Sequence, residues 1–112
     1  FGVISNNLAM AIASVSNDQS DLERALAMMN GLLKQDPENP FFLDTRGHVL
    51  AKLGQLNEAV RDLERSLSKT RNKEAAHLML VELYRHLGMP EQAAQHQSML
   101  LAEQAAPKAA TR

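Results

Sequence analysis

The stretch "GHVLAKLGQLNEA", residues 47–59, decides the fold of this 112-residue chain. Within it, Gly54 separates two segments whose leucines and alanines recur at helical spacing, which predicts a helix, a tight turn and a second helix packed back on the first. The landmarks of this stretch return at an interval of 34 residues, as Ala25, Ala59 and Ala93, and as Gly54 and Gly88. A fixed interval of this size is typical of a solenoid of helix pairs, so we expect an all-α fold.

The composition favours a soluble globular protein, with 45% hydrophobic residues, 22% charged residues and a net charge of −1. The balanced charge argues against a nucleic-acid surface or an anionic membrane surface, both of which need a basic excess. The chain has no cysteine and no apolar run of about 18 residues, so we expect no disulfide, no thiolate nucleophile and no membrane insertion. Because it starts at Phe1, we interpret it as a fragment or a processed product, and its compartment stays open between the cytoplasm and a bacterial periplasm.

Six helices are expected from turn and cap signals. The first covers Ser5 to Val15, with Leu8, Ile12 and Val15 on its apolar face. The second starts at Ser20 in a capping box with Glu23, and the third starts at Asn39-Pro40 and stops at Gly54. Asn57 caps the fourth helix, Asn72 caps the fifth, which stops at Gly88, and Pro90 opens the sixth. We therefore expect one domain over residues 1–104, with repeats at about 5–38, 39–72 and 73–104, and a disordered tail at 105–112.

These residues resemble the tetratricopeptide repeat (TPR) family, which has a glycine at the turn and an alanine early in the second helix of each pair. The second repeat carries the likeness most completely, in Gly47, Leu50, Gly54, Leu56, Ala59 and Leu63. The resemblance implies a right-handed α-solenoid of about three antiparallel helix pairs, and the strings "NNLA" and "LDTRG" are more similar to bacterial members. Arg46 and His77 depart from the family, which usually has apolar or aromatic residues at these positions.

The resemblance also implies a concave groove, lined by the first helix of each pair, that holds a peptide or a helix of a partner protein. Met and Leu side chains would accept apolar groups, and Asn would bind backbone groups. Leu78 and Met79 are adjacent on one helix, so only one of them can face the core. The residues that the family pattern assigns to this groove are Asn6, Met10, Asp44, Thr45, His48, Lys52, Leu78, Met79, Glu82 and Arg85.

Signals of catalysis or metal binding are missing from the sequence. There is no Gly-rich phosphate loop and no nucleophile elbow, and Glu74-x-x-His77 is only half of a di-iron pattern. Asp62 and Arg65 are spaced to pair on the outer face of the fourth helix. We therefore expect a non-catalytic protein–protein interaction module without a cofactor or a metal.

The alternative interpretation is structural. The chain would be the C-terminal segment of a longer solenoid that forms a homo-oligomer through its N-terminal end, or that scaffolds a multiprotein assembly. The apolar start from Phe1 to Ile4 favours this alternative, because another repeat or another chain would cover it.

Overall fold

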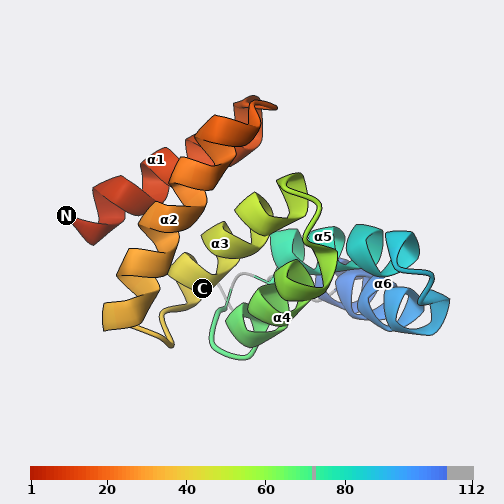
Figure 1. Ribbon diagram of the computed structural model, residues 1–112. Helices are drawn as coiled ribbons and strands as arrows, with labels where there is room; N and C mark the ends of the chain where they lie inside the picture. The colour runs from red at the N-terminus through yellow and green to blue at the C-terminus, as the bar shows by residue number, and fades with distance from the viewer. Residues whose placement is uncertain (72, 106–112) are drawn as a thin grey trace. The chain divides into compact units, whose positions relative to one another are not determined.

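The computed structural model describes residues 1–71 and 73–105, and these form α-helices joined by short turns (Figure 1). The expected all-α fold is confirmed, and no strand occurs in the described part of the chain. The chain divides after Arg71 into two units, of which the first holds four helices and the second holds two. The helices are α1 (Gly2–Val15), α2 (Gln19–Gln35), α3 (Pro40–Lys52), α4 (Leu56–Leu67), α5 (Glu74–His86) and α6 (Pro90–Ala105).

The helix starts differ from the predicted ones by up to three residues. The Asp18 side chain, not Ser20, caps α2: its Oδ1 accepts the Ser20 N–H at 2.8 Å. Asn39 caps α3 as expected, because its Oδ1 accepts the N–H groups of both Phe41 and Phe42 at 3.0 and 3.2 Å. α1 begins at Gly2 rather than Ser5, and α4 begins at Leu56, so Asn57 lies inside that helix.

Two predictions fall wholly or largely outside the described residues. The cap assigned to Asn72 is one of them, and Lys73 directly precedes α5. The tail assigned to 105–112 is the other, except for Ala105, which is the last residue of α6.

Two glycines end the first helix of their pairs in the same way. Gly54 and Gly88 have φ angles of 81° and 70°, a left-handed conformation that is strained for other residues. In the first turn the Gln55 N–H donates to the Leu50 carbonyl at 2.9 Å, and in the second the Met89 N–H donates to the Tyr84 carbonyl at 2.8 Å. This six-residue closure is the Schellman motif, which turns the chain back so that the next helix packs antiparallel on the previous one.

Small residues set the distance between paired helices. Ala25, Ala59 and Ala93 are buried, as the 34-residue interval predicts. A β-carbon added at Gly47 would lie 2.8 Å from Leu63 Cγ, so α3 and α4 approach one another closely at this point. In the first unit, Ala9, Ala13, Ala25, Met29 and Val49 form one buried cluster, against which Phe42 and Leu53 pack.

The prediction for the apolar face of the first helix is wrong for Leu8 and Val15, whereas its third residue, Ile12, packs against the buried cluster. Leu8 and Val15 are exposed, and the buried residues of α1 are Ala9 and Ala13. The face with small side chains is the one that packs, because it lets α2 and α3 approach α1. An apolar stripe is left on the outside of α1.

Candidate functional site

Six of the predicted groove residues lie on two packed helices of the first unit, and five of them have exposed surface. Asn6 and Met10 are half-buried on α1, and α1 packs against α3. On α3, Asp44, His48 and Lys52 follow one another at intervals of four residues, which places them along one face of the helix. The structure therefore brings the predicted residues of each helix together within this unit.

Thr45 corrects the predicted set. Its side chain is buried, with 1% of its surface exposed, so it offers no surface to a partner. Thr45 follows Asp44 directly, and successive residues of a helix point about 100° apart, so it turns toward the core while Asp44 remains half-buried.

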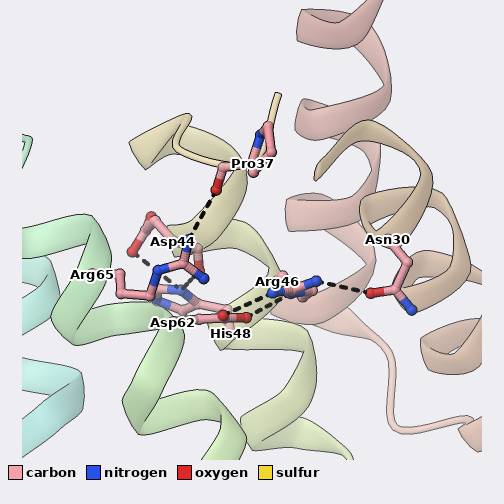
Figure 2. A network of polar contacts seen from close by, with 7 residues as sticks. All are labelled: Asn30, Pro37, Asp44, Arg46, His48, Asp62 and Arg65. Carbon is pink, nitrogen blue, oxygen red and sulfur yellow. Dashed lines mark hydrogen bonds and ion pairs between the residues drawn. The ribbon is translucent and has the colours of Figure 1, made fainter. Parts of the chain in front are cut away.

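The polar groups on the α3 face contact each other and the turn after α1. His48 Nδ1 lies 2.8 Å from the Asp44 carbonyl oxygen and 3.5 Å from its carboxylate (Figure 2). Burial raises the pKa of Asp44, and the nearby His48 opposes this shift. At the end of the helix, Lys52 Nζ donates a hydrogen bond to Asn17 Oδ1 at 3.0 Å.

Asn6 carries an acceptor that the fold leaves unused. Its Oδ1 is buried and has no hydrogen-bond partner within the described parts of the chain. A buried amide oxygen without a donor costs free energy, about 1–3 kcal/mol in mutational data.

The other predicted groove residues lie on α5, in the second unit. Leu78 is 49% exposed and Met79 is half-buried, so Met79 is the one that turns toward the core. Glu82 and Arg85 are exposed on the same helix. The Arg85 Nη2 donates weakly to Gln97 Oε1 of α6, at 3.4 Å.

Arg46 forms a polar site that the sequence did not predict. Its Nε and Nη2 donate to the two carboxylate oxygens of Asp62 at 2.6 and 2.9 Å, and its Nη1 donates to Asn30 Oδ1 at 3.1 Å (Figure 2). The hydrogen bond with Asp62 raises the pKa of Arg46, so the guanidinium stays charged. Three helices, α2, α3 and α4, are joined through this side chain. The site borders a cavity of about 230 Å³, lined by Leu26, Asn30, Arg46, Leu50, Glu58, Arg61, Asp62 and Arg65.

The predicted Asp62–Arg65 pair is wrong, because both residues have other partners. Asp62 is buried against Arg46, whereas the Arg65 Nη2 donates to the Pro37 carbonyl at 3.2 Å and to Glu38 Oε1 at 3.1 Å. Glu38 also pairs with Lys69, at 2.9 Å. These two cations lower the pKa of Glu38, and they tie the α2–α3 turn to the end of α4.

A second unpredicted polar contact lies between α5 and α6. His77 Nδ1 is 2.8 Å from His96 Nδ1, and His77 Nε2 is 3.1 Å from Glu103 Oε1. The only sequence signal for this contact and for Arg46 is the departure from the repeat pattern, which places a polar residue where an apolar one is usual. In the parts of the chain that the structure describes, no group of three or more His, Asp or Glu side chains has the geometry to hold a metal ion.

Comparison with known proteins finds a partial similarity. No model of a protein family matches the chain. The TPR repeat-containing thioredoxin TTL4 of Arabidopsis thaliana is 35% identical to it over 72 residues, which is 64% of this chain and 11% of the plant protein. The chain thus spans about a tenth of the length of that relative. The similarity supports a TPR-type repeat, and, because the relative is a plant protein, it does not support the expected bacterial origin. No helix in residues 1–71 and 73–105 is long and apolar enough to cross a membrane.

Proposed function

We propose that this chain is a non-catalytic protein–protein interaction module that holds a segment of a partner protein against the first helices of its pairs. The similarity to a TPR repeat protein supports an interaction module in general. The observation that carries the proposal is on α5, where a large apolar side chain, Leu78, stays half exposed although the opposite face of that helix is already buried.

The side chains on α1, α3 and α5 match the chemistry of an extended or helical segment. The half-buried Asn6 side chain would have to turn its amide outward to bind a backbone group of the segment, and Leu78 with Met79 can take an apolar side chain. Asp44 and Lys52 provide one charge of each sign on α3, and Glu82 and Arg85 do so on α5. A suitable segment therefore has an apolar side chain and charged residues of both signs.

Partner capture with matched surface variants tests this proposal. The Leu78→Asp and Lys52→Glu variants should each lose a captured partner. Their controls, Leu101→Asp on α6 and Lys34→Glu on α2, should retain it, because Leu101 is 56% exposed and Lys34 is exposed outside the proposed surface. Circular dichroism first establishes that each variant is folded. A partner that binds all five proteins alike would show that the proposed surface is wrong.

A second candidate function, self-association through α1, has its own observation. Ile4 and Val15 are 73% and 81% exposed, and Leu8 lies between them on the same stripe. If Leu8 corresponds to Arg46 in the repeat, Ile4 and Val15 correspond to Phe42 and Leu53 of α3, which pack against the cluster formed with α1 and α2. The equivalent face of α1 would then fit a helix pair of a second copy of this chain.

Light scattering over a range of protein concentrations tests this second candidate. A mass that rises with concentration in the parent but not in an Ile4→Glu variant would support it. Leu101→Glu, which adds the same charge at an exposed apolar position of α6, should behave like the parent. A parent that stays monomeric at every concentration would reject self-association.

A further inference from the structure

The two histidines between α5 and α6 are buried and directly hydrogen-bonded. His77 comes from the first turn of α5 and His96 from the middle of α6, and their rings lie 5.0 Å apart. His96 also stacks on the Tyr84 ring, at 5.6 Å and an interplanar angle of 11°. Both imidazoles are thus fixed in place by contacts on more than one side.

The contact between the rings limits how many protons the pair can carry. A hydrogen bond between two Nδ1 atoms needs one hydrogen, so one ring donates and the other accepts. His77 has its other nitrogen beside Glu103, which as a carboxylate can only accept, so the Nε2 of His77 carries a hydrogen. One added proton still leaves a single hydrogen between the Nδ1 atoms. A second added proton places hydrogens on both, and it also puts two positive charges on facing rings.

We propose that the His77–His96 pair makes the packing of α5 on α6 sensitive to acid: the pair joins the helices until both imidazoles are protonated, and then separates them. In an unfolded chain both imidazoles are free to take up a proton, with an ordinary pKa of about 6.5. Below that pH the unfolded segment therefore binds more protons than the packed one. Linkage then requires that the packed state loses stability as the pH falls.

Among the described residues, Glu103 and Tyr84 contact the pair. Glu103 is the carboxylate beside His77, with its Oε1 3.1 Å from the His77 Nε2. Tyr84 faces His96 with its ring. The remaining titratable or charged side chains of α5 and α6 are exposed to solvent, namely Glu74, Glu82, Arg85, His86 and Glu91.

Amide hydrogen exchange of the whole chain tests the proposal, because α3 and α4 serve as an internal reference. After correction for intrinsic rates, the population of open α5–α6 should rise as the pH is lowered from about 6.5 to 5.0. The increase should approach about tenfold per pH unit at the acid end, which corresponds to one proton taken up on opening. Protection of α3–α4 should change much less. Equal changes in both helix pairs, or none in α5–α6, would overturn the proposal.

Substitutions assign the acid response to the histidine pair. A double variant, His77→Leu with His96→Leu, replaces the two imidazoles with apolar groups, and it should lose the response while remaining folded. His86→Gln is the matched control and should respond like the parent, since His86 is exposed on α5 and its Nδ1 bonds to the Glu82 carbonyl of its own helix. An unchanged response in the double variant would reject the proposal.

Nitrogen NMR on the parent chain provides a test that needs no substitution. At pH 7.5, one Nδ1 of the pair should carry a hydrogen and the other should not. Detection of hydrogens on both Nδ1 atoms in the folded state at pH 5.0, with the packing of α5 on α6 intact, would refute the proposed mechanism.

Discussion

The α3–α4 pair and the α5–α6 pair place a buried polar residue at the same position and satisfy it in different ways. Asp62 and His96 are 34 residues apart, on the second helix of each pair, and both are buried. Asp62 binds Arg46, whose counterpart on α5 is the buried Leu80. His96 binds His77, whose counterpart on α3 is the buried Leu43. The first helix of each pair thus has two candidate positions, one turn apart, for a residue that contacts the buried polar group of the second helix. On α3 the second position carries the polar partner and the first is apolar, and on α5 the order is reversed.

This difference shows what the repeat determines and what it leaves open. The repeat fixes where a side chain from the second helix points, because the Schellman turns at Gly54 and Gly88 set the same antiparallel packing. It does not fix the chemistry of the contact. One pair uses a charged, bidentate contact between a guanidinium and a carboxylate, and the other uses a hydrogen bond between two imidazole rings.

The largest loss of stability is expected when Arg46 of α3 is replaced by leucine, the residue at the equivalent position of α5. Arg46→Leu leaves the Asp62 carboxylate buried without its partner, and breaking a buried ion pair in this way costs about 3–5 kcal/mol. Urea unfolding measures the loss. Adding Asp62→Leu removes the stranded charge and should recover most of the stability, since apolar replacements of buried pairs are often neutral. A loss well below 1 kcal/mol in the single variant would mean that water reaches Asp62 and that the two pairs differ less than their contacts indicate.

The fold could be predicted from sequence because its determinants are local or periodic. The turn glycines and the buried Ala25, Ala59 and Ala93 follow from the 34-residue interval. The face of α1 that packs against its neighbouring helices could not be predicted in the same way. Leu8 and Val15 have the more hydrophobic side chains, but the small side chains of Ala9 and Ala13 allow the closer helix approach, and shape decided which face packs.

The polar contacts were not predictable because their partners are distant in sequence. Asp62 pairs across 16 residues with Arg46, whereas spacing within one helix favoured Arg65. The His77–His96 contact spans 19 residues and gives no local signal. Thr45 was misplaced for a simpler reason, since the family pattern assigns a face of the helix and Thr45 lies at its buried edge. The proposed partner surface remains a prediction for the other nine residues.

A second prediction concerns how closely the two helices approach one another within each pair. Gly47 faces Leu63 in α3–α4, and their counterparts in α5–α6 are Val81 and Gln97. In Gly47→Ala, the new methyl group would lie 2.8 Å from Leu63 Cγ, so overpacking should cost about 1–3 kcal/mol. Gly31→Ala is the matched control, because no atom lies within 4 Å of an added β-carbon there, and it should stabilise α2 by roughly 0.5–1 kcal/mol. If both substitutions stabilised the chain, the close approach of α3 and α4 would be wrong.

The smallest expected effect concerns how the stability of the first unit depends on pH, in comparison with the second unit. Burial raises the pKa of Asp44, so the folded state favours its protonated form. The contribution of Asp44 to stability is therefore largest in acid, and it is lost as the pH rises from the ordinary pKa of 3.8 through the raised pKa. This dependence is opposite in sign to the one proposed for His77 and His96. Asp44→Asn mimics the protonated acid, and thermal unfolding should show a small gain at pH 7 that vanishes near pH 3. A loss of stability at pH 7 would mean instead that the attraction between Asp44 and His48, 3.5 Å apart, outweighs the cost of burial.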